Sequence, residues 1–417
     1  MGGIMPIGFV RSLKLSIVKV RKGKFKNKYK VRIQPKDKIT GKRVNIPVEY
    51  ADSLNEAKRI ERSLWHKYES GYDYGTAEEL FPVCFERFIE EEYAKGRWEK
   101  KTYKDWEYSS RIFKQYFSHI KMKNMTTYII GSFARKFVED HHVTVSRNSV
   151  IARRLTHLKS YLELMVGTLY PKNPVPPRAL DVFFKNSEKA LRVPRYVLDN
   201  LEIKQIKNYL KKNIDFSEFS SCVSKLAIWV DLETGMRPQE LQALTWGSIQ
   251  KQKNNYVFEL SNSWNDYTKS LNGHLKARKV GEKRTTLPIS LELKSMLDKF
   301  EKYQSKFLKE NGISNFNNFI FLNLNDFQKS SAGYPVTQTS LNEMLKKIGE
   351  EVGIKPEGQW SMYSLRHTIA TKLGNTPGMS YPWAAARMGH TTKEFMKTYV
   401  HVDRDINDQM NNLWINS

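Results

Sequence analysis

The sequence predicts a protein of several domains: a small β-sheet with a helix, then an all-helical segment, then a further unit that begins near residue 195. The length of 417 residues suits about three domains at roughly 100–200 residues each. β-forming residues alternate near the N-terminus, whereas later segments have helical spacing. Two breaker-rich stretches separate them, Gly71–Gly75 and a stretch from Pro171 to Pro194. We therefore expect domains at residues 1–72, 76–183 and 195–417.

The N-terminal segment is predicted to form a three-stranded sheet backed by a helix. Its β-forming runs are residues 13–20, 28–33 and 44–48. Gly23 and Gly41 mark the turns between them. Ser53 and Glu56 then have the spacing of a capping box, which predicts that a helix begins there.

The same segment carries a high density of positive charge. Lys and Arg outnumber Asp and Glu by 69 to 44, giving a net charge of +25, and residues 11–43 hold fourteen cations against the single acid Asp37. This balance indicates a polyanionic partner, most commonly nucleic acid, although a solvated basic face is the alternative. The candidate DNA-binding residues on these strands are Lys19, Arg21, Lys28, Lys30 and Arg32.

Residues 76–170 are predicted to be all-helical. Thr76 to Glu79 resembles another capping box. The expected helices are residues 80–93, 103–117, 128–141 and 146–170. Aromatic residues in the second of these recur three and four residues apart, which favours a helix core over base stacking. Arg153 and Arg154 on the last helix are candidates for a DNA-facing surface, with solvated charge as the alternative.

The cysteine and hydropathy patterns exclude several classes of protein. Cys84 and Cys222 lie far apart and in no metal-ligand spacing, so we expect neither a disulfide scaffold nor a zinc site. No apolar run approaches the roughly 20 residues that span a bilayer, and no signal peptide is evident. We expect a cytoplasmic protein without a membrane partner.

The residues from about 195 onward carry the chemistry. After the capping signature Asp199 to Glu202, Arg237 follows a glycine turn, and Glu240 lies one helical turn further on, where it can orient that arginine. Arg366 and His367 come later, beside the apolar face of another predicted helix. The guanidinium fork of arginine matches phosphate oxygens.

Two further motifs complete the set, Gly389-His390 and Tyr399-Val-His401. Tyrosine is a nucleophile that forms covalent intermediates when its surroundings activate it. Arginine, histidine and tyrosine together are the groups needed to attack a phosphodiester. Tyr381 is a rival nucleophile by residue type, but it precedes a proline and lacks the Val-His pair.

The order Arg237, Arg366, His390, Tyr399 resembles that of the tyrosine recombinase, or phage integrase, family over residues 195–417. The upstream segments are similar to the arm-binding and core-binding domains of integrases from phages and conjugative elements. The resemblance implies the tyrosine recombinase fold. In that fold, an arm-type DNA-binding domain and a helical core-binding domain precede a mixed, mainly α catalytic domain with a small β-sheet.

The resemblance also implies a role for each motif residue. Tyr399 attacks the scissile phosphate and forms a 3′-phosphotyrosine link, Arg237 and Arg366 bind the non-bridging oxygens, and His390 donates a hydrogen bond. The covalent link conserves bond energy, so no ATP, metal or other cofactor is expected. Glu240 and His367 are supporting residues.

Two assignments within this set stay open. The family uses a lysine between the two arginine motifs as general acid, and Lys279 has the best spacing, with Lys276 and Lys283 as alternatives. Three residues before Arg366 the family commonly has histidine, where this chain has Tyr363. Tyrosine is a poor base near neutral pH. Either Tyr363 positions other groups, or His367 or water accepts the proton.

The expected partner is double-stranded DNA at core and arm attachment sites, bound by a homotetramer with the help of accessory DNA-bending proteins in the nucleoid. The tail from 403 to 417 either packs on its own domain or docks on a neighbouring protomer. Integration and excision of a mobile element is the predicted function. The alternatives are a Xer-like resolvase, a type IB topoisomerase and a non-catalytic DNA-binding regulator. The basic N-terminal segment favours the integrase.

Overall fold

The computed structural model describes residues 16–37, 40–191, 193–276, 278–400, 411 and 414–415. The chain divides into two units between residues 192 and 193, and each is described by itself. The start of the first predicted strand and most of the tail from 403 to 417 lie outside the described residues. Within the described part of the chain, no helix is both long and apolar enough to cross a membrane.

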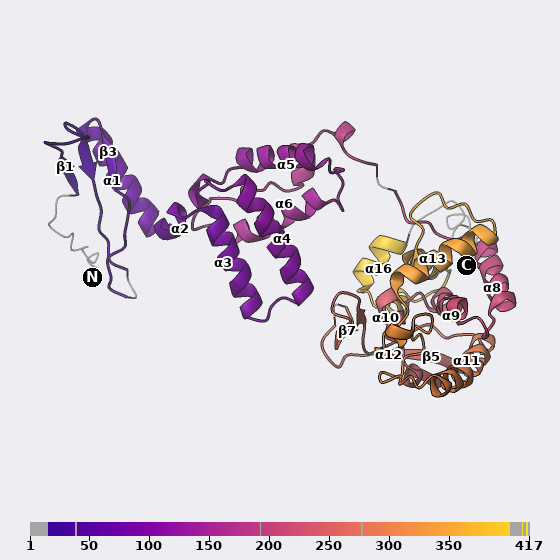
Figure 1. The fold of residues 1–417 in the computed structure, drawn as a ribbon. Coiled ribbons are helices and arrows are strands. Elements are labelled where there is room, and N and C mark those ends of the chain that lie inside the picture. Colours follow the sequence, from indigo (N-terminus) through magenta and orange to yellow (C-terminus); the bar gives the residue numbers. More distant parts are fainter. Residues whose placement is uncertain are drawn as a thin grey trace, which may run out of the picture. The chain divides into compact units, whose positions relative to one another are not determined.

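The first unit begins with a three-stranded antiparallel sheet in the order β1-β2-β3. Its elements are β1 (Ile17–Lys19), β2 (Tyr29–Val31), β3 (Glu49–Ala51) and α1 (Leu54–Glu69). Helix α1 lies along the sheet (Figure 1) and packs on all three strands. The third strand starts after the predicted run 44–48, which contains Pro47. Proline has no N–H for a strand ladder, which accounts for the shift.

Helices make up the rest of this unit. They are α2 (Tyr74–Glu78), α3 (Phe81–Ala94), α4 (Lys100–Tyr116), α5 (Thr127–His141), α6 (Val150–Glu163) and α7 (Ala179–Phe183). Of the aromatic residues in the predicted helix 103–117, Trp106, Phe113 and Phe117 are buried, and Phe113 packs on Phe81 and Phe85 of α3. The prediction of a helix core is confirmed for these three, whereas Tyr108 is exposed.

Three further local predictions in this unit were wrong. Thr76 does not cap a helix, because it lies inside α2 and its N–H donates to Asp73 at 3.0 Å. The last predicted helix, 146–170, is confined to α6. Residues 179–184 are not linker, because Phe183 and Phe184 are buried in the helical core and Phe183 packs directly against Gly131.

The second unit is mainly helical with a small sheet. Its helices are α8 (Asn200–Asn213), α9 (Phe219–Thr234), α10 (Pro238–Gln242), α11 (Leu291–Glu310), α12 (Phe327–Ser331), α13 (Gln338–Glu351), α14 (Met362–Gly374), α15 (Tyr381–Met388) and α16 (Thr392–Tyr399). Its strands are β4 (Ile249–Gln252), β5 (Asn255–Leu260), β6 (Trp264–Asn265), β7 (Ser270–Leu271) and β8 (Arg284–Thr285). Strands β4, β5 and β8 form one antiparallel sheet, and β6 with β7 forms a hairpin. The predicted capping box at Asp199 and Glu202 is confirmed, with both reciprocal bonds present.

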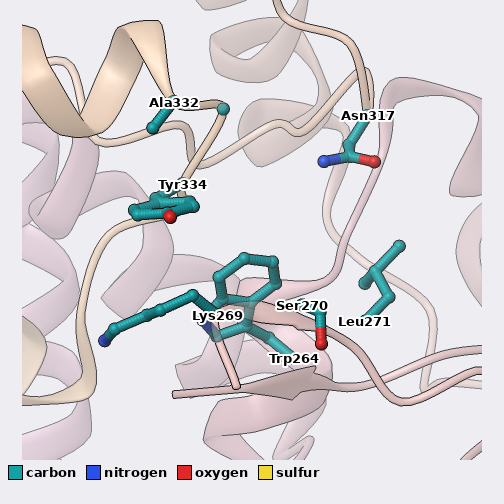
Figure 2. A pocket seen from close by; sticks show the side chains of 8 residues that line it. Trp264, Lys269, Ser270, Leu271, Asn317, Ala332 and Tyr334 are labelled. Carbon is teal, nitrogen blue, oxygen red and sulfur yellow. The ribbon is translucent and has the colours of Figure 1, made fainter. Parts of the chain in front are cut away.

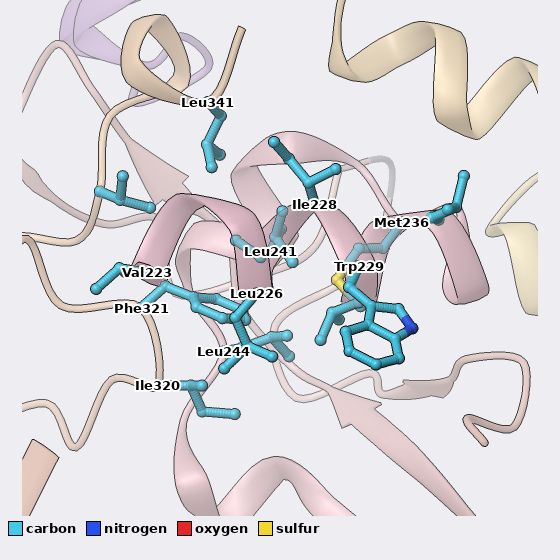
Figure 3. Close-up of a cluster of buried hydrophobic side chains, with 14 of the residues drawn as sticks. Val223, Leu226, Ile228, Trp229, Met236, Leu241, Leu244, Ile320, Phe321 and Leu341 are labelled. Carbon is cyan, nitrogen blue, oxygen red and sulfur yellow. The ribbon is translucent and has the colours of Figure 1, made fainter. Parts of the chain in front are cut away.

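Helix α9 is the centre of this unit. Val223, Leu226 and Trp229 on it are buried and pack with Leu241 and Phe321 from other segments (Figure 3). A helix that is hydrophobic on all sides must be covered on all sides, and α9 contacts α8, α11, α13 and α14. Its C-terminal end, where Arg237 follows, is therefore held by the core.

A second, smaller core joins α14, α15 and α16. It contains Ala370, Ala384, Met388, Phe395 and Tyr399. These three short helices pack on one another, and α15 also contacts β8. The helices that carry Arg366, His390 and Tyr399 are thus fixed by their own apolar contacts.

Candidate active site

The first arginine motif forms the turn between α9 and α10. Helix α9 ends at Gly235 in the left-handed conformation (φ +59°), which glycine adopts without steric cost. A Cβ on Gly235 would also lie 3.0 Å from the Cβ of Ile369 on α14. Pro238 then occupies the first turn of α10, and Arg237 is its N-cap residue. The glycine allows the turn to sit directly on α14.

Glu240 is the counter-charge of two arginines. Arg237 Nη1 donates to its Oε1 at 3.0 Å, and the backbone N–H of Arg237 donates to its Oε2 at 2.8 Å. Arg284 Nη2 donates to the same Oε2. Burial pushes the pKa of Glu240 upward, but Arg284 and Arg237 outweigh it and hold the pKa below its ordinary value. The carboxylate therefore stays ionised, and the predicted orientation of Arg237 by Glu240 is present in the geometry.

Arg284 is a member of this cluster that the sequence analysis missed. It lies on β8, its side chain is 4% exposed, and it donates to the carbonyl of Arg387 as well as to Glu240. Burial, partly offset by Glu240, lowers the pKa of Arg284. The sequence signal that could have indicated a buried Arg284 is the alternation of a strand. Side chains two residues apart share a face, and Arg284 and Thr286 are both buried.

Arg366 is buried on α14 and links three segments. Its Nη1 donates to the carbonyl of Gly235 at 2.8 Å, and its Nη2 donates to the carbonyl of Met388 and, at 2.9 Å, to His390 Nε2. Burial, followed by the charge of Arg237, lowers the pKa of Arg366 to about 10. The guanidinium remains charged at neutral pH.

His390 follows the end of α15, where Gly389 has φ +66°. A Cβ on Gly389 would lie 2.9 Å from Arg284 Nε and 3.2 Å from Arg237 Nη1, so glycine is required for the arginines to approach. Burial, then Arg366 and Arg237, lower the pKa of His390 to about 3. The ring is neutral, and because Nε2 accepts from Arg366 we assign the proton to Nδ1. Among the described residues this buried Nδ1 has no hydrogen-bond partner.

Tyr399 is the last residue of α16 and is 4% exposed. Its ring lies 5.5 Å from that of His390, nearly parallel, and 5.3 Å from that of His367. Burial raises the pKa of Tyr399. The charges of Arg366, Arg237 and Arg195 lower this pKa, and that of Glu394 raises it. The net direction is upward, so the hydroxyl keeps its proton at neutral pH.

The structure thus brings together Arg237, Arg366, His390 and Tyr399, which are far apart in the sequence. Tyr363 is half-buried on α14, and the Arg195 guanidinium lies 4.9 Å from the centroid of its ring. His367 reaches the cluster through its contact with the Tyr399 ring.

The three candidate lysines lie on the connection between β7 and β8. Lys276 and Lys279 are exposed, whereas Lys283 forms an ion pair with Glu259 at 2.7 Å. In the described part of the chain, none of the three makes a hydrogen bond or ion pair with the arginines, His390 or Tyr399. The choice of Lys279 stays a prediction.

The candidate DNA-binding residues of the sheet differ in their surroundings. Lys19, Arg21 and Arg32 are exposed, while Lys28 and Lys30 are half-buried. Lys28 forms an ion pair with Asp52 at 3.0 Å, between side chains that both reach solvent. Lys30 stands opposite Val18 and Tyr50 in the ladder, on the face that α1 leaves open.

Arg154 requires a correction. Its side chain is 1% exposed and donates to the carboxylate of Asp105 at 2.6 Å, the carbonyl of Asp105 at 3.0 Å, and Ser109. A guanidinium bound in this way holds α6 on α4 and is not available to a phosphate. Arg153 is exposed, 3.6 Å from Asp105, and keeps its place among the candidates.

A separate cavity of about 240 Å³ lies between the β6–β7 hairpin and residues 332–334. Figure 2 shows the Trp264 indole, the Tyr334 ring and Lys269 around it, with Asn317 on the far side. None of the predicted site residues lines this cavity, so it is distinct from the cluster around Tyr399.

Comparison with known proteins identifies the family. The family model for the phage integrase family matches residues 196–405, just over half of the chain. A search of curated protein sequences gave no match.

Solved structures agree on the fold. The Tn1549 transposon integrase with transposon right end DNA is 19% identical, with a TM-score of 0.60 over 80% of this chain and 99% of that one. The XerH recombinase bound to palindromic difH substrate is 16% identical, with a TM-score of 0.55 over 87% of this chain and 89% of that one. A lambda integrase dimer on a core site is 14% identical, with a TM-score of 0.50 over 94% and 97%. At these identities the likeness establishes the tyrosine recombinase fold, and together with the family match it shows that this chain belongs to the phage integrase family.

Proposed function

We propose that this protein is an integrase that cleaves and rejoins DNA at specific sites to integrate and excise a mobile element. The observation that carries the proposal is the convergence of four side chains at one place: the buried Arg366, the partly buried Arg237, a neutral His390 whose Nδ1 has no partner among the described residues, and Tyr399. This set contains a nucleophile and the groups that neutralise charge on a phosphate.

The chemistry assigns one task to each group. The Tyr399 oxygen forms a bond to phosphorus, its proton passes to a base or water, and the bond from phosphorus to the 5′-oxygen breaks. The 5′-oxygen takes a proton from a general acid, for which Lys279 is our candidate. Charge on the non-bridging oxygens is neutralised by Arg237 and Arg366, and the Nδ1–H of His390 donates to the same phosphate. Attack by a 5′-hydroxyl reverses these steps and releases Tyr399, so the bond energy is conserved and no ATP is consumed.

Burial of the site strengthens these interactions. Tyr399, Arg366 and Glu240 are removed from water, and charged donors act more strongly where the local dielectric is low. The hydrogen bonds of Arg237 and Arg366 to Gly389, Gly235 and Met388 hold both guanidinium groups in place before DNA binds.

We assign roles to the three predicted domains on the same basis. Residues 1–72 bind arm sites, residues 76–183 bind the core site, and residues 195–417 catalyse cleavage. Support comes from the solved relatives, which include an integrase with transposon end DNA and a lambda integrase dimer on a core site. The active assembly is a homotetramer on DNA in the cytoplasm, with accessory DNA-bending proteins.

A nicked suicide duplex carrying the repeat that flanks the element tests this function. The nick lets the cleaved fragment diffuse away, so the covalent adduct accumulates. We expect wild type and the control Tyr381→Phe to form the adduct, and Tyr399→Phe to bind the duplex without forming it. Absence of adduct from wild type would leave only a DNA-binding role.

A further inference from the structure

The backbone around Arg195 is fixed against the segment that precedes α14. Gln359 N–H donates to the carbonyl of Pro194 at 2.9 Å, and Tyr196 N–H donates to the carbonyl of Gln359 at 3.1 Å. A Cβ on Gly358 would lie 2.6 Å from the carbonyl oxygen of Pro194, so this close approach requires glycine. Arg195 is therefore held at a defined place beside α14.

Contacts on both sides of this backbone pairing between residues 194–196 and Gln359 make it rigid. The hydroxyl of Tyr196 donates to Glu202 at 2.6 Å, and the Tyr196 ring packs edge-on against Trp360. The N–H of Leu198 donates to the hydroxyl of Thr368 on α14 at 2.9 Å. The chain just before α8 is thus tied to the same helix that carries Arg366.

The side chain of Arg195 stacks on Tyr363. Its guanidinium carbon lies 4.9 Å from the ring centroid, within the range of a cation–π interaction. Tyr363 precedes Arg366 by three residues on α14, so the two side chains are neighbours on the helix surface. A tyrosine in this position offers the guanidinium the face of an aromatic ring.

The charge of Arg195 reaches the nucleophile and is not neutralised. It is one of the groups that act on the pKa of Tyr399, together with Arg366, Arg237 and Glu394, while the rings of His390 and His367 pack on the tyrosine. Glu240 compensates Arg237 and Arg284. By contrast, across the part of the chain that the structure describes, Arg195 forms no ion pair, and its side chain is only partly buried.

We propose that Arg195 is a further phosphate-binding residue of the active site and that Tyr363 is the positioning residue that holds it there. This inference rests on the proposed function. The Arg195 guanidinium is partly exposed, has no acidic partner among the described residues, and lies on Tyr363, one helical turn before Arg366. A guanidinium in this place is suited to bind an oxygen of the scissile phosphate or of the next phosphate in the strand. Tyr363 then acts through its ring, and its hydroxyl takes no proton from Tyr399.

Single-turnover cleavage of the suicide duplex by the full chain tests the pair. We expect Arg195→Ala to slow adduct formation by about 10- to 100-fold, the worth of one charge-assisted contact. Arg195→Lys is expected to recover part of this loss. Tyr363→Ala is expected to match Arg195→Ala, and the double variant to be no slower than either single, because both remove one interaction. Tyr363→Phe keeps the ring and is expected to slow adduct formation much less than Tyr363→Ala does.

A pH series separates positioning from folding. Because Arg195 lowers the pKa of Tyr399, its removal is expected to move the rise of the cleavage rate to higher pH. A merely structural role would not cause this shift. Lys294→Ala is the matched control, since Lys294 also stacks on a tyrosine at 4.9 Å, that of Tyr256, but takes no part in the site.

Each outcome bears on the proposal. Wild-type rates for Arg195→Ala, in a preparation whose wild type forms adduct, would overturn it. A Tyr363→Phe variant as slow as Tyr363→Ala would also overturn it, by assigning the role to the hydroxyl. If Tyr363→Ala does not fold, Arg195→Ala and Tyr363→Phe decide alone. No adduct from wild type would instead refute the proposed function.

Discussion

At the scale of single residues, the site gathers three arginines around the carboxylate of Glu240, and a fourth arginine lies on Tyr363. Arg237 and Arg284 share Glu240, Arg366 relies on backbone carbonyls and His390, and Arg195 stacks on Tyr363. Buried charge is costly unless it is paired. Binding of a phosphate is therefore expected to stabilise the cluster, because the phosphate supplies further negative charge for the arginines.

Glu240→Gln is expected to destabilise the protein strongly. It leaves two guanidinium groups, one of them 4% exposed, without their carboxylate. Removing one partner of a buried pair costs about 3–5 kcal/mol. The free energy of unfolding measured in denaturant checks this. Glu282→Gln, which breaks an exposed pair with Arg278, is expected to change little, and an equally small effect of Glu240→Gln would contradict the account.

The pKa of His390 predicts how stability depends on pH. This pKa is lowered from about 6.5 to about 3. Between these two pH values the unfolded chain binds a proton at His390 and the folded chain does not. The contribution of His390 to stability is complete above pH 6.5 and is lost as the pH falls toward 3. We expect unfolding free energy to fall more steeply over this window in wild type than in His390→Asn. Parallel curves for the two proteins would mean that His390 is not held neutral.

At the scale of elements, two glycines allow the helices to converge. Gly235 and Gly389 end α9 and α15 in the left-handed conformation, and each leaves room for a neighbour that a Cβ would displace. Three of the helices that meet at the site are short, α10 with five residues and α15 and α16 with eight each, so their ends and caps fix the positions of the side chains they carry.

Gly389→Ala is expected to reduce cleavage and stability together. The alanine Cβ would clash with Arg284 and Arg237. In addition, the left-handed backbone conformation would cost an alanine about 1 kcal/mol. Gly378→Ala is the matched control, because φ there is +76° and no atom lies within 4 Å of the added Cβ. A larger loss of cleavage in Gly389→Ala than in Gly378→Ala, measured with the suicide duplex, would confirm the contact. Equal losses would mean that only the left-handed backbone of Gly389 matters, and not its close approach to the arginines.

Local signals predicted the elements where a single motif decided the outcome, as in the capping box of Asp199 and Glu202. They failed where two signals competed. Asp73 caps the short helix α2, which contains Thr76, whereas the helix that Thr76 was expected to start begins separately after Leu80. Phe183 packs into the core although it lies in the stretch that was expected to be linker. Arg284, Arg195 and the buried Arg154 escaped correct prediction for a related reason. Their partners come from distant segments, and no spacing along the chain reveals them.

At the scale of the whole molecule, charge is concentrated where we expect DNA. Fourteen cations lie within residues 11–43, and exposed Lys19, Arg21 and Arg32 belong to the sheet domain. This basic sheet domain is the feature on which our preference for an integrase over a resolvase rests.

Deleting residues 1–70 is expected to remove binding at arm sites while core-site cleavage continues. Loss of these cations should also flatten the dependence of DNA affinity on salt, because fewer counterions are released. Footprinting of full-length and truncated protein at several salt concentrations checks both effects. Unchanged footprints at all sites would refute the assignment of this domain.

The central claim is that Tyr399 becomes covalently joined to DNA. Protease digestion of the adduct formed on the suicide duplex, followed by mass spectrometry of the DNA-linked peptide, tests it most directly. We predict a peptide containing Tyr399, joined through its side-chain oxygen to a 3′-phosphate. A linkage at Tyr381 or any other residue, or no adduct with intact wild-type protein, would contradict the account.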